Sequence, residues 1–230
     1  MQLLDGKDPL AKSPPRVSDA PEDRRRWNRR PESRPAEILA AAFEVFAEAG
    51  YDRTTIADVG ERAAVSPALV VHYFGSKADL FGAVIEDRFA SFVAGEEALL
   101  ASHRGSYRDL LHQLVRRFWE HLWQPGAIEL ALVVKAERSE FPECARTLSQ
   151  LGGRWRRLIE GVLEAGQQQG EFRVSGPHVA RVIGAMVWGV AEANRCLGTV
   201  EAHPSTPEEL WAGLVALLDH GVIAVQGDSK

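Results

Sequence analysis

Apolar residues recur every three or four positions through most of the chain, which is the pattern of one buried face of an α-helix. The run that begins at Pro35 shows this spacing most clearly. Its apolar positions are Ile38, Leu39, Ala42, Phe43 and Phe46. No stretch alternates apolar and polar residues with the period of two that a half-buried strand requires. The pattern therefore predicts an all-α protein.

Helix start and stop signals divide this pattern into about nine helices. Ser66 followed by Pro67 has the cap and the first-turn proline that are typical of a helix N-terminus. Thr55 and Asp58 have the spacing of a capping box, with Asp where Glu is more usual. The predicted helices cover about 35–49, 55–63, a segment from 66, then 76–100, 107–123, 127–138, 142–170, 177–197 and 206–225, with a possible bend at 152–153.

The segment 1–33 differs in composition from the rest of the chain. It is rich in Pro, Asp, Arg and Ser with little apolar periodicity, so we expect a disordered arm. It lacks the long apolar stretch of a signal peptide, and no run of 18 uncharged apolar residues predicts a membrane span. Cys144 and Cys196 are too few for a disulfide framework and are expected to be small buried hydrophobes. These features predict a cytoplasmic protein without a membrane partner.

Charge is distributed unevenly along the chain, although the net charge is only −5. Residues 24–34 hold six arginines against one acid, Glu32. Residues 35–92 hold four basic side chains against nine acidic ones, a balance of −5. The positive charge is therefore concentrated in a short basic arm that precedes the first predicted helix.

A short helix, a tight turn and a second short helix follow one another from Thr55, which is the helix-turn-helix arrangement. Residues 36–89 carry A-x-x-x-F-x-x-x-G-Y, T-T-I-x-D-V, A-x-V-S, H-Y-F and S-K-x-x-L-F. These motifs resemble the N-terminal domain of TetR-family transcriptional regulators. The resemblance implies a three-helix DNA-binding domain in 34–80 and a helical effector-binding and dimerisation domain in 81–230. The second part resembles the family only in the number and length of its helices.

The resemblance implies that the second helix of the motif lies in the DNA major groove. Val70 then takes the place of a buried leucine, and Phe74 closes the core. The residues expected to face DNA are Ser66, Pro67, Ala68, Leu69, Val71, His72 and Tyr73. Two positions depart from the family pattern. Val71 replaces a tyrosine that touches a phosphate, and Ala64 replaces a glycine that is common in the turn.

Direct reading of base edges by this helix is expected to be limited. His72 is its only side chain with strong hydrogen-bonding capacity for base edges, whereas its apolar residues can contact thymine methyl groups. The predicted phosphate contacts are Arg29, Arg30, Arg34, Thr54, Thr55 and Lys77. Because the helix-turn-helix body is acidic, we expect the arginines of the basic arm to supply most of the sequence-independent affinity, through phosphates or the minor groove.

The C-terminal half is predicted to hold an effector cavity and a dimer interface. Its tryptophans and wide apolar faces favour a site for a small apolar or aromatic effector. The candidate cavity residues are His112, Arg116, Trp119, Trp123, Phe141, Trp155, Met186 and Trp188. The last two helices could pair two chains into a four-helix bundle, although the same stripes also suit an intramolecular core. The candidate interface residues are Gly184, Gly189, Leu210, Trp211, Leu214 and Leu218.

By this resemblance the predicted function is that of a ligand-responsive repressor, which binds a palindromic double-stranded DNA operator as a homodimer and is released by the effector. The helix that begins at Ser76 joins the two domains and is the expected lever between them. Two alternatives are a transcriptional activator and an adaptor that keeps the fold but binds protein instead of DNA.

The sequence gives little support to an enzyme. It contains no G-x-S-x-G, P-loop or G-x-G-x-x-G motif, and its seven histidines lack the spacing of metal ligands. We predict no catalytic residue, no metal and no cofactor.

Overall fold

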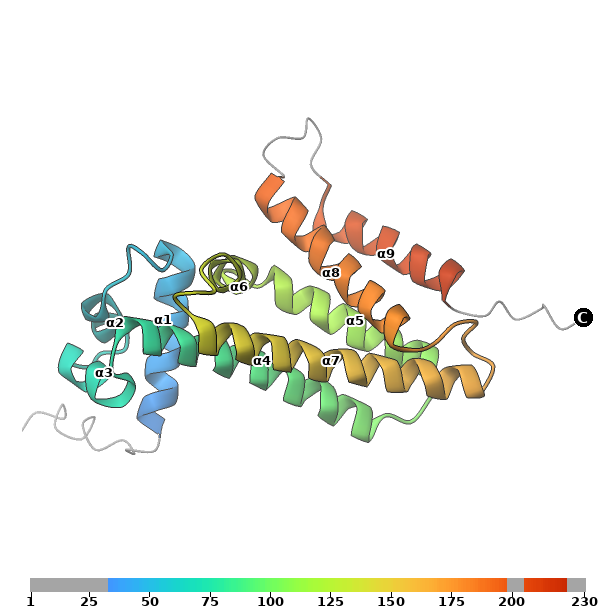
Figure 1. Cartoon of the computed structure of the whole chain (residues 1–230), viewed down its shortest axis with the longest axis horizontal. Coiled ribbons are helices and arrows are strands. Elements are labelled where there is room, and N and C mark those ends of the chain that lie inside the picture. Colours follow the sequence, from blue (N-terminus) through green and yellow to red (C-terminus); the bar gives the residue numbers. More distant parts are fainter. Residues whose placement is uncertain (1–32, 198–204, 223–230) are drawn as a thin grey trace, which may run out of the picture. The chain divides into compact units, whose positions relative to one another are not determined.

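The computed structural model describes residues 33–197 and 205–222, and it confirms the all-α class for these residues. The helices are α1 (Arg34–Ala49), α2 (Ile56–Arg62), α3 (Pro67–Phe74), α4 (Lys77–Ser102), α5 (Tyr107–Trp123), α6 (Ala127–Ala136), α7 (Pro142–Gln168), α8 (Pro177–Leu197) and α9 (Pro207–Gly221), as drawn in Figure 1. Within the described ranges their number agrees with the nine predicted helices. The seventh continues through Gly152 and Gly153 as one helix. The predicted disorder of residues 1–32 and the extension of the last helix to 225 lie outside the described residues.

Side-chain caps set the start of most helices. The hydroxyl oxygens of five Ser and Thr residues accept a hydrogen bond from the backbone N–H three positions later, at Thr55, Ser66, Ser76, Ser106 and Thr206. Thr55, Ser76 and Thr206 form complete capping boxes. The Asp58 carboxylate accepts from both the backbone N–H and the hydroxyl of Thr55, at 2.8 Å each, so the predicted Asp-type box is confirmed. Each cap contributes about 1 kcal/mol to stability.

The buried side chains form two apolar clusters. The first contains the core of the helix-turn-helix, with Phe46, Val59, Val70 and Phe81, but it also contains Leu130 and Val134 of α6 and Phe141 and Cys144 at the start of α7. Burial raises the pKa of the Cys144 thiol to about 11, in agreement with its predicted role as a small buried hydrophobe. The helix-turn-helix therefore shares its apolar core with α6 and the start of α7.

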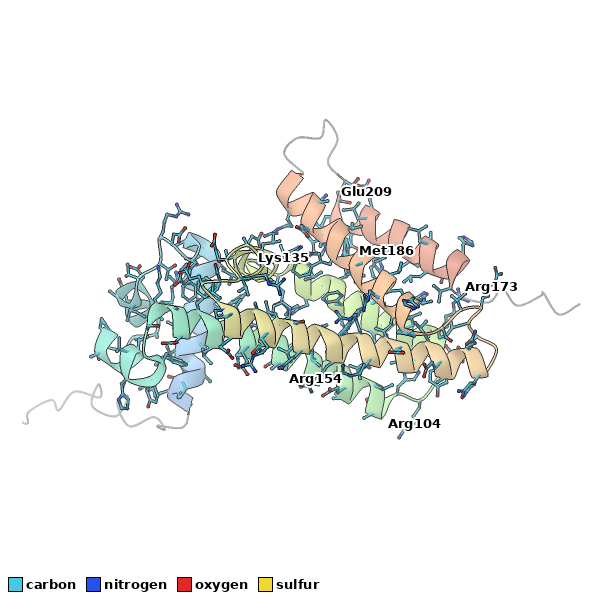
Figure 2. All side chains as sticks on the ribbon, viewed as in Figure 1. Arg104, Lys135, Arg154, Arg173, Met186 and Glu209 are labelled. Atoms are coloured by element: carbon cyan, nitrogen blue, oxygen red, sulfur yellow. The ribbon has the colours of Figure 1, made fainter. Side chains whose placement is uncertain are left out.

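The second apolar cluster is built by α5, α7, α8 and α9, with contributions from α4 and α6. Its most deeply buried members include Leu110, Leu114, Ile159, Leu163 and Val187. Ion pairs connect its outer surface, for example between Arg154 of α7 and Glu97 of α4 at 2.7 Å (Figure 2). This cluster surrounds the cavity described below.

In the described part of the chain, no helix taken singly has the length and apolarity needed to cross a membrane. Only α3 and α4 taken together, with a bend of 67° where they meet, satisfy the length and composition criteria.

Candidate DNA-binding surface and ligand cavity

The helix-turn-helix is held by a close approach of α2 and the start of α3. The backbone N–H of Val65 donates to the carbonyl of Gly60 at 2.8 Å. A Cβ atom added to Gly60 would lie 3.0 Å from the Val65 carbonyl oxygen. At the start of α3 the Ser66 hydroxyl accepts from the Leu69 N–H at 3.2 Å. These contacts fix the orientation of α3 relative to α2.

The turn between α2 and α3 places Ala64 in the left-handed region, with φ of 53°. It is the one non-glycine residue with positive φ in the described chain. The Cβ atom makes this conformation costly for an L-residue, which explains why glycine suits the position.

Ala64→Gly is therefore expected to raise the free energy of unfolding by up to about 1 kcal/mol, because it removes the strain at a small cost in chain entropy. Urea denaturation of the two proteins measures this. Ala63→Gly is the matched control, because Ala63 has φ of −81°, and it should lower stability. Equal destabilisation by the two substitutions would contradict the prediction, because glycine would then relieve no backbone strain at position 64.

The outward face of α3 agrees with the predicted DNA-facing set. Val70 is completely buried, and Phe74 packs partly buried against the core. Ser66, Pro67, Ala68 and His72 are exposed, and Leu69 is half-buried. Val71 is 47% exposed and Tyr73 37%, so both side chains are available on the outer face of the helix. The His72 and Tyr73 rings lie 5.4 Å apart in an edge-on arrangement, so one polar and one aromatic group project together.

The predicted phosphate contacts differ in their surroundings. Thr54 does not fit the role, because it is only 1% exposed and its hydroxyl donates inward to the Gly50 carbonyl at 2.8 Å. Thr55 is exposed but its hydroxyl serves the cap of α2. Lys77 donates to the Tyr51 carbonyl at 3.0 Å and lies over the Tyr51 ring. Arg34 begins α1, whereas Arg29 and Arg30 lie outside the described residues.

The basic side chains of the helix-turn-helix body are already engaged. Arg62 binds Glu44 at 2.9 Å and Glu48 at 2.7 Å, and hydrogen bonding to Arg62 lowers the pKa of Glu48. Arg53 donates to the Ala49 carbonyl at 2.8 Å, and the Arg88 guanidinium lies 3.7 Å from the centre of the Phe43 ring. With Lys77, these are all four cations of residues 35–92. Only Arg62 is paired with acidic side chains, but the nine acidic residues of this stretch leave the body with a net charge of −5.

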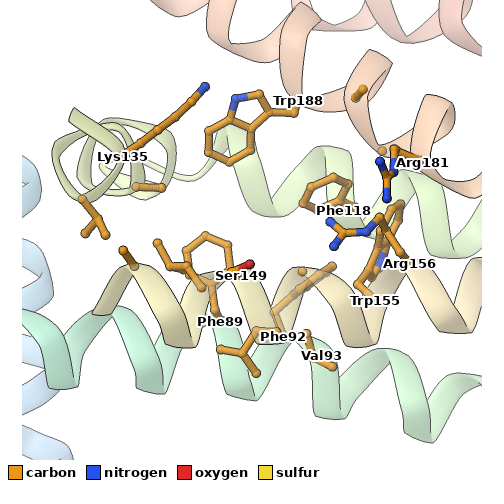
Figure 3. Close-up of a pocket in the computed structure, with 18 of the residues that line it drawn as sticks. Phe89, Phe92, Val93, Phe118, Lys135, Ser149, Trp155, Arg156, Arg181 and Trp188 are labelled. Atoms are coloured by element: carbon orange, nitrogen blue, oxygen red, sulfur yellow. The ribbon is translucent and has the colours of Figure 1, made fainter. Parts of the chain in front are cut away.

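A cavity of about 520 Å³ lies in the C-terminal helices, within the range of about 300–1,000 Å³ that is typical of small-molecule sites. Residues of α4 to α8 and the segment after α6 line it. Trp155 and Trp188, two of the eight predicted cavity residues, are in its wall (Figure 3). Aromatic side chains from α4 and α5 complete the apolar part of the wall, namely Phe89, Phe92 and Phe118.

The other six predicted cavity residues do not line this cavity. Trp119 and Trp123 lie 5.3 Å apart, and Trp119 also approaches Trp211 of α9. Phe141 packs on Tyr51 and Phe81 in the helix-turn-helix core. Met186 packs half-buried against the second apolar cluster. His112 Nε2 lies 3.0 Å from an Asp219 carboxylate oxygen of α9, and Arg116 forms an ion pair with Glu208 at 3.2 Å. Both residues line a separate hollow.

Sequence reasoning missed the remaining cavity residues for identifiable reasons. Phe89 and Phe92 are three positions apart on one helix, so they offered a usable signal of a shared face. Arg156 and Arg181 carried none, because both are exposed, and an exposed arginine ordinarily serves only to be solvated. Which face of α7 and α8 borders the cavity is decided by how these helices pack.

Two ionisable groups stand behind the cavity wall. Glu96 is buried, and its pKa is raised by burial, while its bond from the Arg117 guanidinium opposes this shift. His121 stacks on Phe92 with ring centres 4.5 Å apart, and only 8% of it is exposed. Burial, followed by repulsion from Arg88, lowers the pKa of His121 to about 4. His121 is therefore neutral in the folded protein at neutral pH.

This burial of His121 predicts acid sensitivity. The unfolded chain takes up the proton near pH 6.5 and the folded chain only near 4, so stability is fully present above about pH 7 and is lost as pH falls between these values. The loss amounts to about 3 kcal/mol at most. His121→Leu should flatten the fall in urea-derived stability between pH 7 and 4. An equally steep fall in the variant would contradict the assignment.

α6 contacts the helix-turn-helix directly. Gly126 caps α6 with φ of 80°, and a Cβ atom added there would overlap Ala47 of α1, whose Cα would be only 2.9 Å away. Val134 lines the cavity and belongs to the same apolar cluster as Val59 and Val70. The sequence predicted α4 as the lever between the two domains, and the structure adds a second connection through α6.

The predicted interface residues on α8 and α9 divide into buried and exposed groups. Leu214 and Leu218 are buried within the chain, and Leu210 and Trp211 pack partly buried against the same cluster. Gly184 faces Trp155, since a Cβ atom there would lie 3.1 Å from that ring. These residues are part of the intramolecular core. Gly189 is exposed, as are the apolar side chains of Val182 on α8 (55%) and Leu217 on α9 (61%).

Within the described ranges, no group of three or more His, Cys, Asp and Glu side chains is placed to hold a metal ion.

Comparison with known proteins assigns both parts of the chain. The family profile described as bacterial regulatory proteins, tetR family, matches residues 38–84. A second profile, AefR-like transcriptional repressor, C-terminal domain, matches 109–212. The HTH-type transcriptional repressor NicS of Pseudomonas putida is 28% identical over 137 residues, which are 59% of this chain and 64% of NicS. The chain thus aligns with slightly less than two thirds of that relative.

Solved structures share the fold. A transcriptional regulator from Saccharomonospora viridis in complex with choline has a TM-score of 0.72 at 22% identity and covers 85% of this chain and 100% of its own. FadR from Bacillus subtilis in complex with stearoyl-CoA has a TM-score of 0.62 at 16% identity, with 80% and 96% coverage. The helix-turn-helix motifs, the two matching profiles and the shared fold lead to one conclusion: the chain belongs to the TetR family of bacterial regulatory proteins.

Proposed function

We propose that this protein is a ligand-responsive repressor, which binds a palindromic operator as a homodimer and leaves it when a small effector fills the cavity between α4 and α8. The observation that carries the proposal is the pairing of an exposed reading helix with an apolar cavity through one shared core. NicS, which is named a repressor, and the ligand complexes of the S. viridis protein and FadR support it.

Nuclease footprinting with the purified full chain tests the proposal. We expect protection of a promoter fragment over two half-sites with centres about 34–36 Å apart, because two copies of α3 must reach successive major grooves. Protection should weaken as salt rises. A chain that protects no native promoter fragment at low ionic strength is not a DNA-binding repressor, and this result would favour the protein-binding adaptor.

Effector response is proposed to act through α6 as well as α4. Val134, Lys135 and the segment after α6 border the cavity, while Leu130 and Gly126 of the same element touch the helix-turn-helix core. A ligand that fits better when α6 is displaced would therefore shift α1 and the reading helix. Coupling of this kind requires different ligand affinities for the DNA-bound and free states.

Dimerisation is proposed to use the surface that α8 and α9 leave uncovered. Leu217→Glu places a charge on this surface, so it is expected to weaken self-association at least a hundredfold and to yield a monomer in light scattering, because burying an unpaired charge is costly. Val174→Glu is the matched control, since Val174 is 40% exposed outside both helices and should stay dimeric. If Leu217→Glu remains a dimer of normal stability, the interface lies elsewhere.

A further inference from the structure

All charged side chains in the wall of the cavity are positive. Four cationic side chains take part in it, and no Asp or Glu does among the described residues: they are Lys135, Arg138, Arg156 and Arg181. The remaining wall is mainly aromatic and aliphatic, and Trp155 is almost completely buried there. A molecule that enters therefore meets apolar surface inside and positive charge at the mouth.

Arg156 and Arg181 at the cavity differ from Arg154 and Arg195, which lie on the same two helices and are paired with acidic side chains. Arg154 of α7 binds Glu97 at 2.7 Å, and Arg195 of α8 binds Glu129. No hydrogen bond or ion pair joins Arg156 or Arg181 to any residue that the structure describes. Because neither guanidinium group is paired with an acidic side chain of the described residues, both keep their N–H donors and their positive charge for an anion.

The two ends of the cavity are not equivalent. At one end Lys135 is within 3.7 Å of Glu192, and the Trp188 indole N–H donates to the same carboxylate at 2.6 Å. Lys135 is therefore paired, which leaves Arg138 as the one cation of this end that is unpaired within the described chain, against two at the other. At the other end Figure 3 shows Arg156 and Arg181 near Trp155, with their guanidinium groups turned into the space between α7 and α8. A bound molecule would thus be oriented, with its charged group at the arginine end.

We infer that the cavity binds an amphipathic anion, whose carboxylate or phosphate oxygens lie at Arg156 and Arg181 and whose apolar body packs against Phe92, Phe118 and Trp155. The inference rests on the proposed function, since it assigns the chemical class of the effector. Guanidinium groups bind such oxygens through paired, charge-assisted hydrogen bonds. The apolar body gains free energy by leaving water. A quaternary ammonium, by contrast, would be repelled at this mouth.

A ligand series with one apolar chain and four head groups tests the inference. Decanoate, decyl phosphate, decanol and decyltrimethylammonium are titrated into the full chain by calorimetry, below their micellar concentrations and without DNA. We expect one or both anions to bind at least tenfold more tightly than decanol, and the cation to bind most weakly. The ratio of decanoate to decyl phosphate distinguishes the two anionic heads. The series is repeated with chains of six and fourteen carbons.

Matched arginine variants locate the anion. Arg156→Gln and Arg181→Gln are each expected to weaken anion binding tenfold or more and to leave decanol binding unchanged. Arg157→Gln is the control, because Arg157 is the next residue on α7, is exposed and does not line the cavity. It should bind the anion normally, and circular dichroism confirms that all three variants fold.

The inference is overturned if decanol binds as well as the anions, if the cation binds best, if no anion of any length binds, or if Arg157→Gln weakens binding as much as Arg156→Gln. These outcomes are independent of DNA binding. Anion binding that fails to release a protected promoter fragment would contradict the proposed repressor mechanism and leave the ligand class standing.

Discussion

Deleting residues 1–33 is expected to weaken DNA binding strongly and to flatten its dependence on salt. The deletion removes five arginines of the basic arm, which are Arg24, Arg25, Arg26, Arg29 and Arg30, together with Arg16, Lys7 and Lys12 nearer the N-terminus. Removing one arginine–phosphate interaction lowers the slope of log affinity against log salt by about 0.9. Suppose that all five arginines of the basic arm touch phosphates. The ratio of the full chain's DNA affinity to that of the truncated chain should then fall by roughly 500-fold when salt rises from 50 to 200 mM. Fluorescence anisotropy with a footprinted fragment measures both slopes.

The effect is large because the body behind the arm supplies little positive charge. Arg62 is held by two glutamates, and Lys77 donates to backbone carbonyls. Two full-length variants separate charge from chain length. Replacing the five arginines with glutamine should lower the DNA affinity and the salt slope as the deletion does. Replacing them with lysine should keep the salt slope and lose only the part of the affinity that depends on the guanidinium group. Unchanged affinity and slope after the deletion would show that the arm does not contact DNA.

Gly126→Ala is expected to lower the free energy of unfolding by about 2–4 kcal/mol. Two costs combine: a Cβ atom at φ of 80° is strained, and the same atom overlaps Ala47 of α1. The contact lies where the cavity-lining α6 meets the helix-turn-helix. A variant that still folds should therefore also show an altered concentration of effector for half-release of DNA.

Two comparisons separate the costs of this substitution. Gly50 has the same φ of 80° but no atom within 4 Å of an added Cβ, so Gly50→Ala carries the backbone strain of about 1–2 kcal/mol alone. Adding Ala47→Gly to Gly126→Ala removes the overlap and should recover part of the stability. Urea denaturation of the unmodified chain, Gly126→Ala, Ala47→Gly and the double variant gives the coupling between the two positions. A Gly126→Ala variant no less stable than Gly50→Ala would mean that α6 can move away from α1 freely.

Within the described residues, the helices and their starts were predictable from the sequence, because they depend on local chemistry. The caps at Thr55, Ser66 and Thr206 need only a side chain and an N–H three positions away. The buried place of Val70 followed from the spacing of the motif. The exposure of the residues predicted to face DNA followed from the same motif, because the burial of Val70 fixes which side of this short helix faces outward.

The cavity could not be predicted at the level of residues. Residues of five helices and a connecting segment form its wall. The apolar face of each helix can be predicted from the sequence, but the neighbouring helix that covers this face cannot. Trp155 lines the cavity while Trp119 packs against other tryptophans, although both lie on apolar faces. The sequence by itself thus determined the helices, the helix-turn-helix and the uneven charge, all of which are encoded locally. Only the tertiary structure decided that Thr54 points inward, that α6 meets α1 at Gly126, and that Arg156 and Arg181 border one cavity, because these depend on contacts between segments distant along the chain.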